Sequence, residues 1–340
     1  MEKILSISIA AYNVEKFLIQ TLDSFITDKE IMDKLEVIIV SDGSTDDTVD
    51  LATGYVKRYP DTYVLIDKEN GGYGSTINAS LKVAKGKYFR TVDGDDWVST
   101  DGLKELIAAL ERIDTDMVIT KYMNVDDATM KKTLVEDGFK YDEVEKRFDS
   151  VQLDDMIPMH QTTYRTEILR KNRIKITEHC FYTDMEYNLK PIPYVNTIRF
   201  LDIPVYMYRI GREGQSVQIS SWFKNINQGL KVSVNLAKYF EKVKCIDSMS
   251  EAKLRYMKDT ITKSAIFKYR IMLAMPPKKA FHKMRKYDAV LKKVSPEIYE
   301  NTEKQGRKKY RYTIKALRKT DFMSYPVFYA IYKADSQIKD

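Results

Sequence analysis

The sequence predicts an α/β fold: a mostly parallel sheet flanked by helices, followed by a helical C-terminal extension. Three observations support this prediction. Short apolar runs alternate with amphipathic stretches over about the first 120 residues, turns rich in glycine and aspartate follow several runs, and the pattern beyond about residue 220 is almost purely helical. With 340 residues, 44% of them hydrophobic, the chain is long enough for one large domain with a substantial extension.

The expected elements of the first half alternate regularly. Strands are expected at 5–10, 36–40, 63–66, 87–92 and 117–122, and helices at 14–25, 46–58, 75–84 and 103–110. The run Glu36 to Val40 is nearly all apolar, which is typical of a strand covered on both faces. Ser44 or Thr45 is expected to cap the second helix, and Ser99 or Thr100 lies near the start of the fourth.

Two regions are expected along the chain. The α/β region should span residues 1–220, with one part at about 1–122 and a second, mixed part at about 123–220. A basic helical extension should occupy residues 221–340. We find no internal repeat.

Composition narrows the class of protein. The formal charge is +7, and Lys and Arg crowd the last hundred residues, which indicates an acidic partner there. Nucleic acid, anionic lipid and plain solubility all remain open for that charge. No apolar run approaches the roughly 18 to 20 residues that span a bilayer, and Asn13 and Glu15 interrupt the apolar start, so we expect a cytoplasmic protein. Cys180 and Cys245 match no metal spacing and are expected to be reduced.

The strongest chemical signal is the run Asp93-Gly94-Asp95-Asp96 after the expected strand KYFRTV. Ligands of open α/β sheets gather outside the carboxyl ends of the strands. Carboxylates packed together repel one another, and a hard divalent cation such as Mg²⁺ or Mn²⁺ removes that cost. The alternative is an acidic turn that caps the next helix through Asp95 or Asp96.

Two further turns lie at strand ends. A carboxylate held at Asp42, beside a Gly turn, suits hydrogen bonds from a nucleobase or ribose, although a common turn-and-cap arrangement explains it equally. The run Asn70 to Ser75 carries three glycines and opens a helix, which suits close approach to a phosphate. It is not a Walker loop, because no Lys-Ser or Lys-Thr follows its last glycine.

Together the segments SISIAAYNVEKFLIQTLDS, VSDGSTDDT, ENGGYGSTINASLKVAKGKYF and TVDGDDWV resemble the core of family-2 glycosyltransferases with a GT-A fold. The resemblance covers about residues 3–122 and continues more faintly to about 216. It implies an inverting, metal-dependent transfer of a sugar from a nucleotide sugar to a hydroxyl. Ala10 stands at the usual Pro position, Ser41-Asp42 replaces the usual acidic pair, and Ile77 stands where an Arg often precedes Asn.

The resemblance also implies roles for single residues. Asp93 and Asp95 form the metal element for Mn²⁺ or Mg²⁺, with Asp95 the safer ligand and Asp93 nearer the ribose or sugar of the donor. The residues expected to bind the nucleotide sugar are Ala10, Tyr12, Asn13, Asp42, Gly71, Asn78, Asp93, Gly94 and Arg209.

The segment Thr177 to Tyr187 is similar to the one in which the family places its catalytic base. Asp184 is the candidate, Glu186 is its competitor, and only one of them should face the site. The alternative is that Asp184 merely caps its helix. The stretch 206–216 resembles a segment that closes the donor site, where Arg209 or Arg212 could contact a diphosphate or form surface ion pairs.

The resemblance therefore predicts transfer from a UDP-sugar to a glycan or lipid-linked glycan, in bacterial-type surface polysaccharide synthesis. Basic residues beside aromatic and apolar ones after Lys304 suit an anionic surface on the inner face of the plasma membrane, and equally a helix packed on the core. A sugar nucleotidyltransferase is the rival enzyme, but AAYNVEKF lacks its glycine-rich loop. A non-enzymatic membrane- or nucleic-acid-binding protein is the second rival, and it leaves the acidic cluster unexplained.

Overall fold

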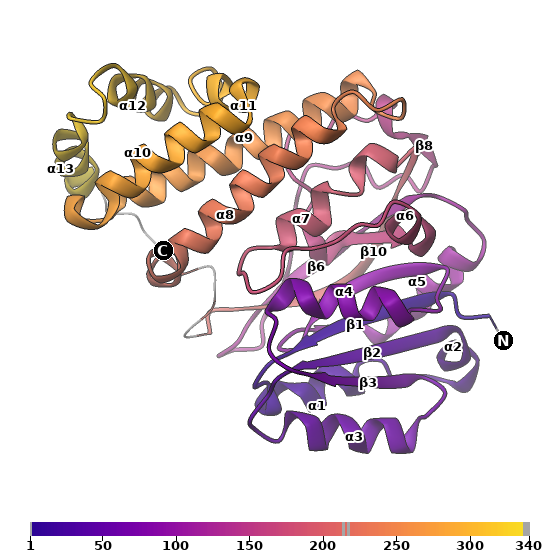
Figure 1. Cartoon of the computed structure of the whole chain (residues 1–340). Coiled ribbons are helices and arrows are strands. Elements are labelled where there is room, and N and C mark those ends of the chain that lie inside the picture. The colour runs from indigo at the N-terminus through magenta and orange to yellow at the C-terminus, as the bar shows by residue number, and fades with distance from the viewer. Residues whose placement is uncertain (1, 213–214, 216–217, 336–340) are drawn as a thin grey trace. The chain divides into compact units, whose positions relative to one another are not determined.

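The computed structural model describes residues 2–212, 215 and 218–335, and the chain divides into two compact units (Figure 1). The α/β unit comprises Met1–Gln152 and Ile157–Arg212. The helical unit comprises Leu153–Met156 and Glu213–Asp340.

One sheet forms the centre of the α/β unit. Its strands are β1 (Leu5–Ala11), β2 (Leu35–Asp42), β3 (Tyr63–Lys68), β4 (Tyr88–Asp93), β5 (Trp97–Val98), β6 (Met117–Asp126), β7 (Lys132–Leu134), β8 (Lys146–Arg147), β9 (Thr162–Arg165) and β10 (Thr197–Ile210). The order along the main path is β3-β2-β1-β4-β9-β6-β10-β5. The first four strands pair in parallel, and so do β6 and β10, whereas β9 is antiparallel to both β4 and β6. Strands β1 to β4, β6 and β10 therefore still end at the same edge.

Helices cover both faces of this sheet. They are α1 (Glu15–Asp23), α2 (Lys29–Lys34), α3 (Thr48–Arg58), α4 (Tyr73–Val83), α5 (Thr100–Glu111), α6 (Thr166–Lys171) and α7 (Asp184–Leu189). Helices α1 and α3 lie on one side of β1 and β2, and α4 lies on the other (Figure 1). Short 3₁₀ turns occupy Phe148–Ser150, Met159–Gln161 and Ile192–Tyr194. This double cover explains why the expected parallel strands are apolar on both faces.

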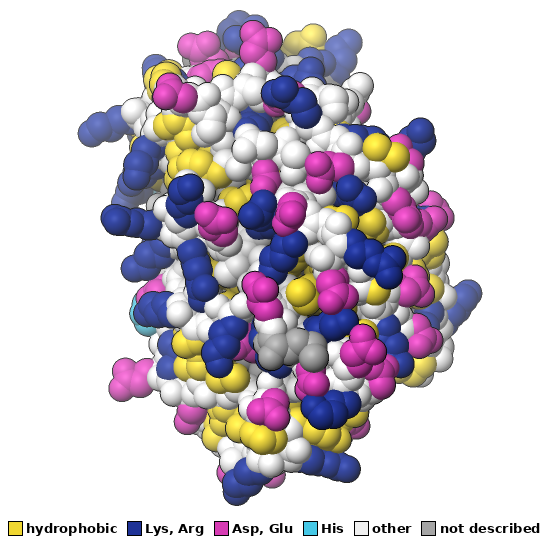
Figure 2. All heavy atoms as spheres, turned by 90° about the vertical axis from the view of Figure 1, so that its right-hand side faces the viewer, with side chains coloured by type: hydrophobic (Ala, Val, Ile, Leu, Met, Phe, Trp, Pro, Cys, Tyr) yellow, Lys and Arg dark blue, Asp and Glu magenta, His cyan; other side chains and the backbone are white. Residues whose placement is uncertain are grey.

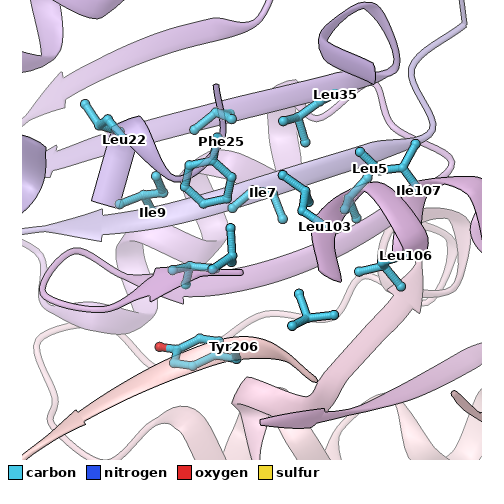
Figure 3. Packing of buried hydrophobic residues seen from close by; sticks show 14 of the residues in the cluster. Leu5, Ile7, Ile9, Leu22, Phe25, Leu35, Leu103, Leu106, Ile107 and Tyr206 are labelled. Atoms are coloured by element: carbon cyan, nitrogen blue, oxygen red, sulfur yellow. The ribbon is translucent and has the colours of Figure 1, made fainter. Parts of the chain in front are cut away.

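Alternate residues of β1 build the main core. Leu5, Ile7 and Ile9 are fully buried, and Figure 3 shows them facing Leu22 of α1 and Leu103 of α5. Helix α5 buries Leu103, Leu106, Ile107 and Leu110, the spacing of one helical face. Burial of each such side chain contributes about 1.5–3 kcal/mol, so the core fixes β1 and β4 and the turns that follow them.

The predicted α/β alternation is confirmed, and one predicted cap is wrong. Ser99 caps α5 by accepting a hydrogen bond from the Gly102 N–H. Helix α3, however, begins at Thr48, after Ser44 and Thr45. Those two residues instead bond Asn13: the Ser44 hydroxyl accepts from the Asn13 N–H, and the Thr45 N–H donates to the Asn13 side chain. A contact with a distant loop has replaced the local cap.

The helical unit contains α8 (Ile219–Val243), α9 (Glu251–Ala274), α10 (Pro277–Val294), α11 (Pro296–Asn301), α12 (Lys308–Lys319) and α13 (Tyr325–Asp335). Helix α9 packs against α8, α10, α11, α12 and α13, so it forms the centre of this unit. Its residues Met257, Ile261, Ala265 and Met272 are fully buried at helical spacing. Among the described helices, none is long and apolar enough to cross a membrane.

Candidate active site

The turn Asp93–Asp96, here called the acidic turn, follows β4 at the carboxyl edge of the sheet. Gly94 allows it to approach β1 closely, because a Cβ at this position would lie 2.7 Å from the carbonyl oxygen of Ala10. The Gly94 N–H donates to that same oxygen at 3.0 Å. Ala10 and Gly94 therefore set the height of the turn above the sheet through their backbones.

Asp96 holds the turn to β10. Its side chain is 2% exposed, and its two carboxylate oxygens accept from the Tyr206 hydroxyl at 2.7 Å and the Arg209 N–H at 2.8 Å. Burial, followed by the charges of Asp93 and Asp95, raises the pKa of Asp96 well above its usual range. Asp96 is thus occupied by structural bonds.

Asp93 is half-buried, and one of its oxygens is buried. Among the described residues, no group donates a hydrogen bond to its buried Oδ1 atom. Burial, and then the charge of Asp95, raises the pKa of Asp93 to about 7, and the charge of Asp184 adds to the shift. Oxygens of Asp93, Asp95 and Asp96 lie within 4.8 Å of one another. An all-carboxylate set with an unsatisfied buried oxygen fits a hard divalent cation.

Arg209 and Arg212 lie beside this turn. Arg209 is 5% exposed, and its guanidinium donates to the Asp95 carbonyl, to Asp127 and to Gln20 at 2.6–2.9 Å. Arg212 forms an ion pair with the Asp95 carboxylate. These contacts favour a positioning role for Arg209 and the ion-pair alternative for Arg212. Glu213, Gly214 and Ser216 of the stretch expected to close the donor site lie outside the described residues.

Asp42, at the end of β2, holds the glycine-rich loop. Its buried carboxylate accepts from the Gly71 and Gly72 N–H groups at 2.8 and 2.7 Å and from Lys68 Nζ at 2.6 Å. The Ser75 hydroxyl donates to it at 3.0 Å. Four donors bond this carboxylate, three of them at Oδ1, so in this conformation its partners are the glycine-rich loop, Ser75 and Lys68.

The glycines of that loop permit close packing with the segment 176–180. A Cβ at Gly74 would lie 2.2 Å from the Thr177 carbonyl oxygen, and Gly72 has a φ of +78°. Asn78 bonds the same segment, with its amide donating to the Ile176 carbonyl and to Glu178 and accepting from the Ile176 N–H. Close packing against this segment therefore explains the glycines of the loop. The same packing brings the segment, which precedes α7, to the edge of the sheet.

Tyr12 and Asn13 follow β1 at the same edge. Tyr12 is 54% exposed, so its ring is available to a ligand. Asn13 has a φ of +52° and bonds the loop after β2, as described for Ser44 and Thr45. An Asn side chain tolerates this left-handed backbone better than most others do. Asn13 thereby links the loops after β1 and β2.

The two candidate bases have different surroundings. Glu186 is fully buried and accepts from the Thr177 N–H at 2.6 Å, the Thr177 hydroxyl at 2.8 Å and Lys190 Nζ at 2.8 Å. Asp184 begins α7 and is partly exposed. Its charge raises the pKa of Asp93, as noted above, and that of the Tyr208 hydroxyl.

His160 packs inside an aromatic cluster. Its ring stacks on Tyr208 with centroids 5.0 Å apart and lies 4.3 Å from the ring of Tyr122. Burial, and then the charge of Arg90, lowers the pKa of His160 to about 3, so the ring is neutral. This packing favours a structural role over contact with an acceptor.

Comparisons with known proteins show what this chain is similar to. Residues 6–173 match the model of "Glycosyl transferase family 2". This match covers just under half of the chain, which is thus similar to glycosyltransferase family 2. The whole chain resembles the crystal structure of S. aureus TarS 1-349 in complex with UDP-GlcNAc, with a TM-score of 0.67 and 20% identity over 98% of this chain and 92% of that one. The likeness confirms the predicted GT-A fold.

Two curated relatives are similar over shorter stretches. The uncharacterized glycosyltransferase EpsJ of Bacillus subtilis (strain 168) is 27% identical over 219 residues, which are 62% of this chain and 62% of EpsJ. Glycosyltransferase GlyG of Streptococcus pneumoniae serotype 4 is 30% identical over 128 residues, 38% of this chain and 42% of GlyG. The chain thus matches less than two thirds of the length of either relative.

Sequence reasoning missed several residues that shape the candidate site. Asp96 was expected only as an alternative cap, yet it fastens β10 to the acidic turn. Lys68 and Thr177 were not singled out, although they bond Asp42 and Glu186. Nothing local marks these residues, because each partner lies at least nine positions away in the chain.

Proposed function

We propose that the chain is an inverting glycosyltransferase that moves a sugar from a UDP-sugar to a hydroxyl of a glycan acceptor. One observation carries this proposal: among the described residues the buried Oδ1 of Asp93 has no partner, and Asp93 lies beside Asp95 at the carboxyl edge of the sheet, in a segment that matches the family 2 model. A buried carboxylate left in this state is costly unless a ligand completes it. A divalent cation that accompanies the nucleoside diphosphate would supply the missing positive charge.

Asp93 and Asp95 would hold Mn²⁺ or Mg²⁺, with Asp96 fixing the turn from below. When bound, such an ion neutralises charge that develops on the leaving diphosphate. Arg212 already pairs with Asp95, so it would adjust its contact when the ion enters. Arg209 would keep the turn in place through Asp95 and Asp127.

Asp184 is the proposed general base. It begins α7, close enough to the acidic turn for its charge to act on Asp93. An inverting transfer needs a carboxylate that takes the proton of the attacking hydroxyl on the side of the sugar away from the leaving group. Glu186 is unsuited to this task, because the Thr177 and Lys190 contacts occupy both of its oxygens.

The donor pocket is proposed along the loops after β1, β2 and β3. Tyr12 offers an exposed ring to the nucleoside, and Asn13 joins the first two loops. Asp42 and Asn78 would act mainly by holding the glycine-rich loop, with Gly71 at its start, against its neighbours. Ala10 and Gly94 would set the floor of the pocket.

The acceptor proposal draws on relatives. TarS of Staphylococcus aureus (strain Mu50) is named poly(ribitol-phosphate) β-N-acetylglucosaminyltransferase, and it is 26% identical over 62% of this chain and 36% of TarS. A solved TarS structure contains UDP-GlcNAc. We therefore propose a UDP-linked donor, a glycan or lipid-linked glycan acceptor, and a cytoplasmic protein peripheral to the inner face of the plasma membrane.

Titration of the purified chain with UDP in the presence of Mn²⁺ tests this function. The intact chain should bind UDP with Mn²⁺ and lose that binding in EDTA, and Asp95→Ala should lose the metal-dependent part. Asp101→Ala, at an exposed aspartate in the first turn of α5, is the matched control and should bind as the intact chain does. UDP binding that is equally strong in EDTA and in Asp95→Ala would remove the metal from the proposal.

A further inference from the structure

The end of the helical unit exposes an apolar stripe. Met323, Val327 and Ile331 recur every four residues and are 73%, 61% and 49% exposed. Val327 and Ile331 lie on α13, and Met323 lies in the turn before it. With Tyr312 of α12, 61% exposed, they are the large hydrophobic residues counted as exposed in the described part of the helical unit. Val327 and Ile331, four residues apart on α13, share one face of that helix, and Met323 precedes it closely in the chain.

The core of the unit does not use this stripe. Helix α13 is anchored by its other side, where the Tyr325 hydroxyl donates to the Met275 carbonyl at 3.0 Å and Tyr332 contacts Tyr310 and Thr313 of α12. Both anchoring tyrosines are buried. Helix α13 is therefore apolar both on the side that packs against the unit and on the exposed side. This pattern is typical of a helix that is buried on both sides.

Positive charge surrounds the stripe. Residues 304–335 contain nine Lys or Arg and two acidic residues, Asp321 and Asp335, and Asp321 forms an ion pair with Arg285 of α10. Helix α12 buries Ile314 and Leu317 and leaves its lysines exposed: Lys308, Lys309, Lys315 and Lys319. The Lys309 ammonium lies 4.4 Å from the centre of the Tyr332 ring, directly beside α13. By contrast, the face in Figure 2 intersperses basic and acidic side chains.

We infer that the surface formed by α12, α13 and the turn between them, here called the basic-apolar face, docks on an anionic lipid surface. The stripe would enter the boundary of the acyl chains while the lysines contact the headgroup phosphates. A second copy of the same face would oppose like charges, and nucleic acid would leave the apolar stripe uncovered. The inference rests on the proposed membrane location and does not depend on the transfer reaction.

Flotation of the intact chain with vesicles tests this inference. Binding is expected to vesicles of phosphatidylglycerol and phosphatidylcholine in equal parts, to fall with added salt, and to be absent with phosphatidylcholine alone. The variant Met323→Ser/Val327→Ser/Ile331→Ser should lose on the order of tenfold or more in affinity. Each single change Lys308→Gln, Lys315→Gln or Lys319→Gln should lose about fivefold.

The matched control replaces three hydrophobic residues of similar exposure in the α/β unit. Ile19, Val83 and Met130 are 48%, 41% and 45% exposed, and Ile19→Ser/Val83→Ser/Met130→Ser should bind vesicles as the intact chain does. Equal loss in both triple variants, or no vesicle binding by the intact chain, would overturn the inference. So would a dimer that forms with increasing concentration and disappears in the first triple variant.

Titration of UDP with Mn²⁺ on the same preparations separates the two proposals. UDP binding without vesicle binding would overturn the basic-apolar face and the proposed membrane location, and would leave the proposed transfer function standing. Vesicle binding without UDP binding would support the face and overturn the proposed transfer function.

Discussion

The two units each enclose a group of charged side chains, and the groups differ in balance. In the helical unit, Arg318 donates to Asp288 at 2.8 Å and to Glu303 at 3.0 Å, while the Tyr269 hydroxyl donates to Asp288 at 2.6 Å. In the acidic turn, three carboxylates crowd together, and Asp93 Oδ1 lacks a described partner. The first group is complete as it stands, whereas the second lacks positive charge.

This difference separates a stabilising network from a ligand site. Burial lowers the pKa of Arg318, but the charge of Asp288 and the hydrogen bonds to Asp288 and Glu303 outweigh that effect and raise it. The charged form is thus favoured by the fold itself. At Asp93 burial and a neighbouring charge act in the same direction and raise the pKa, so the folded chain disfavours the charged form until a cation arrives.

The largest effect is expected from a substitution of Asp184, the proposed general base. Asp184→Asn keeps the shape of the side chain but cannot take the acceptor proton, so transfer should fall by about 10² to 10⁴. UDP binding with Mn²⁺ should change little. Single-turnover transfer by the folded variant, beside a UDP titration, measures both quantities.

Glu186→Gln is the control for that comparison. Because Glu186 is bonded to Thr177 and Lys190, its loss should lower the free energy of unfolding more than the rate per folded molecule. If Glu186→Gln were inactive and Asp184→Asn stayed active, the general base would be Glu186 instead of Asp184.

Breaking the complete network should cost stability. Asp288→Asn leaves the buried Arg318 with Glu303 as its remaining carboxylate partner in this network, so the free energy of unfolding should fall by about 3 kcal/mol. Urea denaturation followed by circular dichroism measures the change. A change below about 1 kcal/mol would mean that the network contributes specificity rather than stability.

Removing a charge from the acidic turn should not lower the free energy of unfolding, in contrast to the loss expected for Asp288→Asn. Asp93→Asn, measured in EDTA, should be at least as stable as the intact chain at pH 7, because it relieves a crowded carboxylate. The pKa of Asp93 rises on folding from 3.8 to about 7, so the folded chain binds more protons between these values and the intact chain loses stability as pH rises through them. The advantage of the variant should therefore grow by up to about 1.4 kcal/mol per pH unit in that window. Thermal unfolding of the variant and of the intact chain between pH 4 and 8 measures this difference. If the stability of both changed equally with pH, the prediction would be wrong.

The smallest effect is expected at an exposed pair. Arg285 and Asp321 are 54% and 65% exposed, so Asp321→Asn should change the free energy of unfolding by less than about 1 kcal/mol. Added salt should reduce the effect further. A loss comparable to that of Asp288→Asn would show that burial does not distinguish the two pairs.

Much of the fold could be predicted from local signals. The strands that begin at Leu5, Leu35 and Tyr88 are short apolar runs, and a polar or glycine-containing turn follows each of them. Strand β9 was not predicted, because Thr162–Arg165 has no apolar alternation and owes its conformation to pairing with β4 and β6. The predicted site residues Asp93 and Asp95 meet at the expected edge, and their proposed roles await the experiments above.

The sequence by itself determined where the acidic, glycine-rich and asparagine-bearing turns fall relative to the strands, because strand ends and turns depend on residues that are close in the chain. Only the tertiary structure decided which of these polar groups are already bonded. Asp96 is bonded by Arg209, 113 positions away, and Asn78 by Ile176, 98 positions away, whereas Asp93 keeps an oxygen that no described donor reaches. A buried polar group is satisfied or left open by whatever the fold brings beside it, so this distinction cannot be read from neighbouring residues.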